Sequence, residues 1–232
     1  TVQLINAADG YHIWSENYDR NLTDIFEVQD EISSIIANKC RENLTTKEQE
    51  ETLVKAPTHN LDAYTLFLKG LHFHNMITPK YTKKAIECFE QAITLEPNYA
   101  NAYAMAAIGY AFLGATGQIQ PNEAFQLVHT YSDKALQLDS SLAAGYVAKG
   151  SAYLLYDWKW KQAYDSLLKA IELNPPATEA HQMLSFYYTI TGRKKEAVDI
   201  MEKALQVDPL SPRVIQLLAE TYLNAGRTDD AL

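Results

Sequence analysis

One short phrase recurs four times along the chain, and this repetition constrains the fold more than any other feature. The phrase starts with alanine, contains two more apolar residues, and ends with an acidic or amide residue that proline follows in three of the four copies, at residues 92–97, 135–140, 170–175 and 204–209. The leading alanines are 43, 35 and 34 residues apart. A period of about 34 residues with helical patterning indicates stacked helix pairs.

The residues inside each unit fit a pair of closely packed helices. In the fourth unit, Ser185, Ala197 and Ala204 are small residues at helical spacing, which allows two helices to approach each other closely. Gly192 suits a left-handed helix cap at the turn, and Pro209 cannot extend the helix before it. The unit is therefore predicted to be helix, turn, helix.

Several units share the same residue types at matching positions. The first unit contains Leu66, Gly70, Phe73, Ala85, Phe89, Ala92 and Pro97, and the third contains Tyr146, Gly150, Tyr153, Ala163, Leu167, Ala170 and Pro175. This pattern resembles the tetratricopeptide repeat. The resemblance covers residues 61–232 and implies an all-α, right-handed superhelix of four helix pairs and a truncated fifth.

The first 45 residues have a different pattern. VQLINA and YHIWSENY flank the turn Asp9-Gly10 and are expected to form a β-hairpin, and residues 24–43 are expected to form an amphipathic helix. This segment resembles the closing hairpin and helix of the TolB-like amino-terminal domain of bacterial cyclase-like and winged-helix regulators. We therefore expect a TolB-like remnant at 1–45, a linker at 46–60 and the repeats at 61–232, in a fragment of a longer protein.

Composition narrows the class of protein. The chain has 232 residues, 47% of them hydrophobic, and a net charge of −9. This charge argues against a nucleic-acid binder, which needs a basic face. The two cysteines, Cys40 and Cys88, share no close spacing, so neither a disulfide framework nor a zinc cluster is expected. With no long apolar segment and no leader pattern, we expect a cytoplasmic protein without membrane contact.

The sequence offers no catalytic constellation. The six histidines are scattered, and His72 and His74 are two residues apart, on different faces of a helix. No phosphate-binding glycine loop, nucleophile elbow or metalloprotease signature occurs. We therefore expect no enzyme activity in this chain, no cofactor and no metal.

Binding of a protein or peptide partner is the better prospect. The resemblance implies that the first helix of each pair lines a concave groove. Some family members clamp a peptide carboxylate with Lys, Asn and Arg, but Phe67, Leu71, Ala104 and Val147 occupy those places, so an apolar groove is expected. The positions expected to face it are Tyr64, Phe67, Leu71, His74, Asn101, Ala104, Ile108, Val147, Ser151, Gln182, Phe186, Gln216 and Glu220.

Three functions follow from these observations. The first is a non-catalytic protein–protein interaction module of a bacterial multi-domain signalling protein, which binds an amphipathic helix or an extended apolar segment. The second is the regulatory region of a class III adenylate or guanylate cyclase whose catalytic domain lies outside this chain. The third is a structural oligomerisation module, with self-association through the amino-terminal hairpin and helix. Part of the apolar stripe could instead serve only to pack neighbouring repeats.

Overall fold

A computed structural model describes residues 2–5, 12–16, 58 and 60–231. The chain divides into two compact units, Thr1–Leu61 and Asp62–Leu232. In the first unit, β1 (Val2–Ile5) pairs antiparallel with β2 (His12–Glu16), and the register shifts between Leu4 and Ile5. The predicted turn at Asp9-Gly10, the helix at 24–43 and most of the linker lie outside the described residues.

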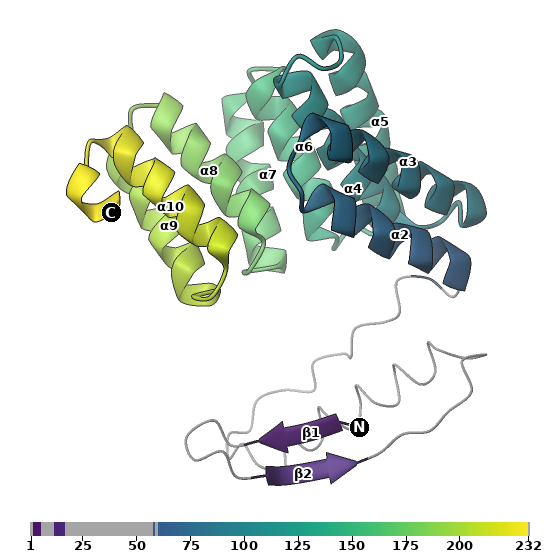
Figure 1. Cartoon of the computed structure of the whole chain (residues 1–232). Coiled ribbons are helices and arrows are strands. Elements are labelled where there is room, and N and C mark those ends of the chain that lie inside the picture. The colour runs from purple at the N-terminus through teal and green to yellow at the C-terminus, as the bar shows by residue number, and fades with distance from the viewer. Residues whose placement is uncertain (1, 6–11, 17–57, 59, 232) are drawn as a thin grey trace. The chain divides into compact units, whose positions relative to one another are not determined.

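In the second unit, every described secondary-structure element is a helix (Figure 1). Its elements are α2 (Leu61–His74), α3 (Pro79–Leu95), α4 (Ala100–Ala115), α5 (Pro121–Leu138), α6 (Ala143–Leu155), α7 (Trp160–Leu173), α8 (Thr178–Ile190), α9 (Lys194–Val207), α10 (Pro212–Ala225) and the 3-10 helix η2 (Thr228–Ala231). The helical character expected after residue 61 is confirmed. The right-handed sense of the superhelix stays a prediction.

The recurring phrase is the last turn of the second helix in each pair. The residue that ends each of these helices donates its backbone N–H to the carbonyl of the leading alanine, at 2.8–2.9 Å, in Glu96–Ala92, Asp139–Ala135, Asn174–Ala170 and Asp208–Ala204. All four alanines are buried. The phrase thus combines a helix end with a position where only a small side chain fits against the next helix.

Glycine lets the two helices of a pair approach each other. A Cβ atom built on Gly70 in α2 would lie 2.4 Å from the Phe89 ring of α3, and one on Gly150 in α6 would lie 2.8 Å from Cγ of Leu167 in α7. Phe89 and Leu167 are fully buried. The larger residue on one helix therefore fills the space that glycine leaves on the other.

The first helices of the pairs also pack against one another. Helix α4 contacts α6, α6 contacts α8, and α8 contacts α10. In Figure 1 the helices follow each other through the array from blue α2 to yellow α10. The first helices therefore form a continuous layer, and this layer carries the site described next. Among the described residues, no helix is both long and apolar enough to cross a membrane.

Candidate functional site

A groove of about 330 Å³ lies on the layer of first helices. The end of α2 and the residues after it, the second half of α4, α6 from Val147 onward, the first half of α8 and the first turn of α10 contribute to it, with one residue from α3. This volume lies at the lower end of the range of ligand pockets. Its lining consists of His74, Asn75, Ile77, Thr82, Ile108, Ala111, Phe112, Ala115, Val147, Ser151, Leu155, Thr178, Glu179, Gln182, Met183 and Arg213.

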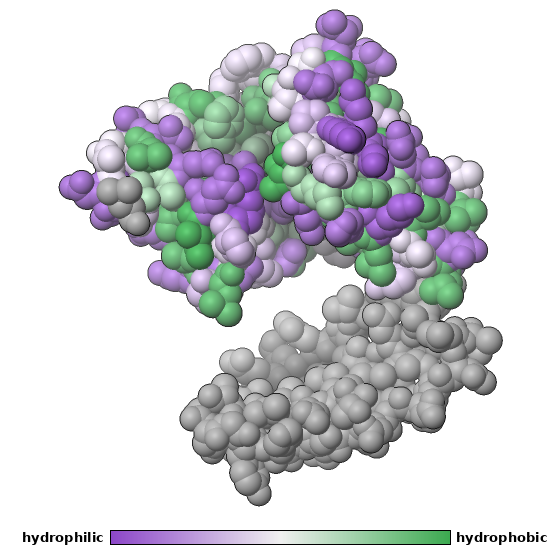
Figure 2. Space-filling model, in the orientation of Figure 1, coloured by the Kyte–Doolittle hydropathy of each residue, from purple (hydrophilic) through white to green (hydrophobic). Residues whose placement is uncertain are grey.

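Apolar side chains from different repeats form most of the groove wall. Ile108 and Phe112 come from α4, Val147 and Leu155 from α6, and Met183 from α8. Figure 2 shows hydrophobic side chains in the hollow between the α2–α6 part and the α8–α10 part, with hydrophilic side chains around it. An apolar wall with a polar border suits a partner that inserts apolar side chains.

His74 and Glu179 provide polar groups at the border of the groove. His74 Nε2, at the end of α2, lies 3.6 Å from Glu179 Oε1, in the first turn of α8. The His74 side chain holds the pKa of the Glu179 carboxyl below its usual range, against the opposing effect of burial. Glu179 is therefore an anion near neutral pH, and the contact joins the first and fourth helix pairs.

Arg213 places a cation beside this contact. Its Nη2 donates to Oε1 of Gln182 at 3.3 Å, and its Nη1 donates to Oε1 of Gln216 at 3.4 Å. Both partners are neutral amides, and Arg213 forms no ion pair among the described residues. Its positive charge contributes to the lowered pKa of Glu179. The border thus carries both signs of charge, over an apolar wall.

Five of the thirteen residues that the sequence places on the concave face line the groove: His74, Ile108, Val147, Ser151 and Gln182. Phe67 and Ala104 are buried instead. The Phe67 ring lies 5.6 Å from that of Phe89 and 5.0 Å from that of Tyr99, and Leu71 packs against the same cluster. Phe67 and Leu71 therefore pack neighbouring helices together.

The other expected positions lie outside the lining. Tyr64 and Asn101 are half-buried, and Phe186 is exposed. Gln216 and Glu220 are exposed on α10, and the Gln216 amide donates to the Glu220 carboxylate at 2.9 Å. Arg213, three residues before Gln216, lines the groove in their place. The groove therefore uses the first turn of α10 and the last turns of α4 and α6.

Helical spacing could have found some of the missed residues. Phe112 lies four residues after Ile108, and Leu155 lies four residues after Ser151, so each continues the predicted face by one turn. Glu179 and Arg213 lie three residues before Gln182 and Gln216, so the same spacing extends the predicted face to them. Spacing does not show that Glu179 meets His74, because this contact depends on how far the repeats rotate along the array.

The titratable and hydroxyl groups near the groove are engaged in local structure. His181 is buried, burial lowers its pKa, and its Nδ1 lies 2.9 Å from the Ala177 carbonyl in its own helix. The Ser151 hydroxyl donates to the Val147 carbonyl at 2.8 Å. Among the described residues, no group of three or more His, Cys, Asp or Glu could hold a metal ion. The arrangement therefore suits non-covalent binding.

Comparisons with known proteins agree with this architecture. Profiles described as tetratricopeptide repeat match residues 80–99 and 188–232. A thermophilic TPR protein of Thermus thermophilus is similar at a TM-score of 0.56 and 21% identity, over 73% of this chain and 86% of that one. The pilF structure of Pseudomonas aeruginosa is similar at a TM-score of 0.50 and 21% identity, over 73% of this chain and 74% of that one.

One curated relative extends the comparison to a larger protein. It comes from Rhizobium meliloti (strain 1021), is named "Putative adenylate cyclase 3", and is 31% identical over 107 residues. The match covers 46% of this chain but only 18% of the relative. It supports the link to adenylate cyclase-like proteins. The repeat profiles, together with the fold, show that this chain carries tetratricopeptide repeats.

Proposed function

We propose that this chain is a non-catalytic protein–protein interaction module that binds a partner segment in the apolar groove. Tetratricopeptide proteins are in general interaction scaffolds, and a stacked array offers an extended concave surface for this purpose. One observation carries the proposal: apolar side chains from α4, α6 and α8 share one groove of about 330 Å³. The chain would serve in a bacterial multi-domain signalling protein of the cytoplasm.

The wall chemistry favours an amphipathic helix or an extended segment with apolar anchors. Ile108, Phe112, Leu155 and Met183 are partly buried, so each still presents surface to a partner. A wall built on packed helices is already ordered, which reduces the entropy lost on binding. His74, Glu179 and Arg213 offer both charge signs to the partner's backbone or polar side chains. Apolar anchors would supply affinity, and these polar groups would orient the segment.

The relationship to a cyclase-named protein supports a second function. In this alternative, the repeats are the regulatory region of a class III adenylate or guanylate cyclase, and they relay partner binding to a catalytic domain outside this chain. The support is the 31% identity to the Rhizobium meliloti protein. The two proposals share the groove and differ only in what partner binding controls.

The domain arrangement belongs to the same proposal. Residues 1–45 would be the end of a TolB-like domain, residues 46–60 the linker, and residues 61–232 the repeat array. The division of the chain into units at Leu61 and Asp62 supports a boundary at this point. The array would then be the part that binds the partner.

Phe112 offers a sharp test of the groove. It lines the groove, is half-buried, and is not among the residues packed against the core clusters, so its replacement should leave the fold intact. Peptides would be selected from a displayed library on the full chain, and their affinity measured by fluorescence anisotropy. Phe112→Glu should weaken the selected peptides by about tenfold or more, because a carboxylate would enter an apolar wall.

Leu168→Glu is the matched control. Leu168 is an exposed leucine on α7, outside the groove, and receives the same charge. Equal affinity of the selected peptides for Phe112→Glu and Leu168→Glu would contradict the groove proposal. For the cyclase alternative, the whole protein would be assayed for cyclic nucleotide formation with and without the selected peptide, and an unchanged rate would argue against the relay.

A further inference from the structure

The turn between the two helices of each pair contains a residue with positive φ. In three of the five turns it is glycine, at Gly117, Gly192 and Gly226, with φ between 69° and 82°. In the other two turns it is Ile77, with φ 45°, and Trp158, with φ 57°. Glycine adopts this conformation freely, whereas a bulky side chain adopts it under strain. The α6–α7 turn therefore places tryptophan at a position that favours glycine.

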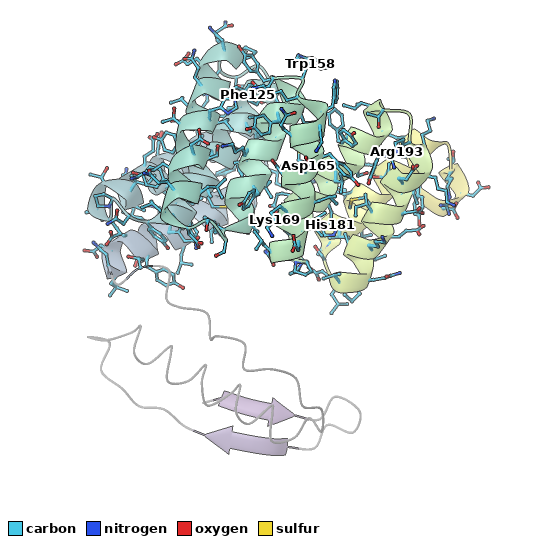
Figure 3. All side chains as sticks on the ribbon, turned by 180° about the vertical axis from the view of Figure 1, so that it is seen from behind. Phe125, Trp158, Asp165, Lys169, His181 and Arg193 are labelled. Atoms are coloured by element: carbon cyan, nitrogen blue, oxygen red, sulfur yellow. The ribbon has the colours of Figure 1, made fainter. Side chains whose placement is uncertain are left out.

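Packing does not account for Trp158. Its side chain is 64% exposed. Its indole contacts that of Trp160, which is 38% exposed, edge to face at 5.5 Å between ring centroids. Figure 3 shows Trp158 at the upper edge of the array, where helices end, with Lys169 and His181 toward the lower edge. The chain thus accepts backbone strain and an exposed indole together, a combination that points to binding rather than folding.

The turn that carries Trp158 is held firmly in place. The Asp157 carboxylate, only 13% exposed, lies 3.2 Å from His129 Nε2 and 3.3 Å from Lys159 Nζ. Tyr156 stacks on Phe125 at 5.0 Å with an interplanar angle of 8°. A partner that binds here meets an ordered surface, so little conformational entropy is lost on binding.

The neighbouring α8–α9 turn adds positive charge. Arg193 ends this turn, and Lys194 and Lys195 follow as the first two residues of α9; all three are exposed. Arg193 lies over the Tyr188 ring at 4.6 Å and pairs with Glu196 at 2.8 Å. Lys194 and Lys195 form no ion pair with any described residue. In a chain of net charge −9, these lysines make a local cationic site.

Aromatic side chains connect the two turns. Trp160 lies 6.4 Å from Tyr187, and Tyr164 lies 6.2 Å from Tyr188, between ring centroids. Helix α7 thereby contacts α8 next to both turns. Tryptophan, tyrosine and arginine are the residues most enriched among binding hot spots. We call the two turns, together with the first two residues of the helices that follow them, the Trp158 edge (residues 156–161 and 192–195).

We propose that the Trp158 edge is a second interaction surface, which binds an acidic segment of a partner protein. An apolar side chain of the segment would lie against Trp158 and Trp160, and its carboxylates would lie near Lys194 and Lys195. A protein segment fits better than a nucleic acid, because two lysines without an ion pair match the few carboxylates of a short acidic segment, whereas a nucleic acid needs an extended basic face that a chain of net charge −9 does not offer. The surface lies on the helix turns and is built from different residues than the groove.

A labelled synthetic peptide that alternates glutamate with leucine and phenylalanine tests the proposal on the full chain by fluorescence anisotropy. Trp158→Gly should weaken this peptide by about tenfold, because an aromatic anchor is lost. The same variant should unfold at an equal or higher temperature, because glycine relieves the positive-φ strain. Unchanged peptide affinity in Trp158→Gly would overturn the proposal, whatever the change in the thermal midpoint.

Ile77→Gly is the matched control for strain. Ile77 also has positive φ and is exposed, but it lies in the first helix pair, away from the Trp158 edge. The Ile77→Gly variant should raise the thermal midpoint of unfolding, as Trp158→Gly does, and leave the affinity for the acidic peptide unchanged. A loss of affinity equal to that of Trp158→Gly would overturn the assignment to the Trp158 edge.

Charge reversal tests the cationic part. Replacing Lys194 and Lys195 together by glutamate should weaken the peptide and reduce the salt dependence of its binding, because attraction between exposed charges is screened by salt. Lys203→Glu, an exposed position on α9 outside the turn, should do neither. A peptide with lysine in place of glutamate should not bind, and equal binding would overturn the proposal.

Two further measurements separate this surface from other readings. Phe112→Glu, which alters the groove, should leave the affinity for the acidic peptide unchanged. A loss of affinity in this variant would place the peptide in the groove and overturn the proposal of a second surface. This outcome does not depend on whether the groove proposal itself is correct. A single-stranded oligonucleotide would be tested in the same assay. If it binds and loses affinity in the Trp158 and lysine variants, while the peptide does not bind, the assignment to a protein partner is overturned.

Discussion

His74 Nε2 and Glu179 Oε1 lie 3.6 Å apart although the two residues belong to the first and fourth helix pairs. The contact spans the border of the groove and joins the end of α2 to the start of α8. Because a helix array normally holds only neighbouring repeats together, a contact between distant repeats limits how far the groove can open. Glu179 is the titratable partner whose pKa this contact lowers.

Acid should weaken this contact. The pKa of Glu179 is below the ordinary glutamate value of 4.5, mainly through His74, so the folded state favours the carboxylate. Its contribution to stability is present above pH 4.5 and is lost as the pH falls from there through the lower folded value. The free energy of unfolding of the wild type, relative to Glu179→Gln, should therefore decline by up to about 1 kcal/mol, because the Glu179 side chain is 48% exposed and water screens the contact.

Chemical denaturation across this pH range measures the decline, and His74→Ala supplies the control. In the His74→Ala background, the effect of Glu179→Gln on the free energy of unfolding should depend less on pH, because Glu179 has lost its main partner. A wild-type advantage that grows as the pH falls would have the opposite sign and would contradict the assignment.

Close approach of α6 and α7 should make Gly150 and Ala170 intolerant of larger side chains. Gly150 faces the buried Leu167, and Ala170 is buried with Val147 and Ala180. Gly150→Leu or Ala170→Leu should lower the free energy of unfolding by about 1–3 kcal/mol or more, through overpacking. Urea denaturation with a fitted slope measures the loss.

Lys169 and Glu172 are the matched controls on the same helix. They form an exposed ion pair at 3.0 Å, three residues apart. Alanine at either position should change the free energy of unfolding by no more than about 0.5 kcal/mol, because exposed pairs contribute little. Equal losses at all four positions would show that the assigned repeat register is wrong.

Met201 should dominate the stability of the last helix pair. It is fully buried against Val214, Leu217 and Leu218, which joins α9 to α10. Met201→Ala should cost about 2–5 kcal/mol through lost burial and the resulting cavity. Met76→Ala removes the same atoms at a 38% exposed position and should cost far less. Similar thermal midpoints for the two variants would contradict this packing.

Glu90 should couple the first two helix pairs. Its Oε1 accepts hydrogen bonds from the hydroxyls of Tyr110, at 2.6 Å, and Tyr131, at 2.8 Å, so one carboxylate on α3 holds α4 and α5. Tyr110→Phe should cost about 1–2 kcal/mol, because a hydrogen bond to a charged group is lost. Tyr103→Phe is the control, because the Tyr103 ring also contacts Tyr131. It should lower the free energy of unfolding by less than Tyr110→Phe does. Denaturation curves that coincide for the two variants would refute the coupling.

The sequence allowed only part of the groove to be predicted. Ile108, Val147 and Ser151 could be placed from helical spacing, since the first helices recur at a known period. Phe67 and Ala104 follow the same spacing but lie outside the lining, because the apolar stripe of a first helix serves both the groove and the contact with its neighbours. Spacing alone does not separate these two uses.

What the sequence by itself determined is the repeating unit. The alanines at Ala92, Ala135, Ala170 and Ala204 mark the last turn of each second helix, since a close helix crossing leaves room only for a small side chain. Only the tertiary structure decided that His74 meets Glu179 and that Arg213 lines the groove. Such contacts depend on small rotations accumulated over several repeats, and no local pattern of residues encodes their sum.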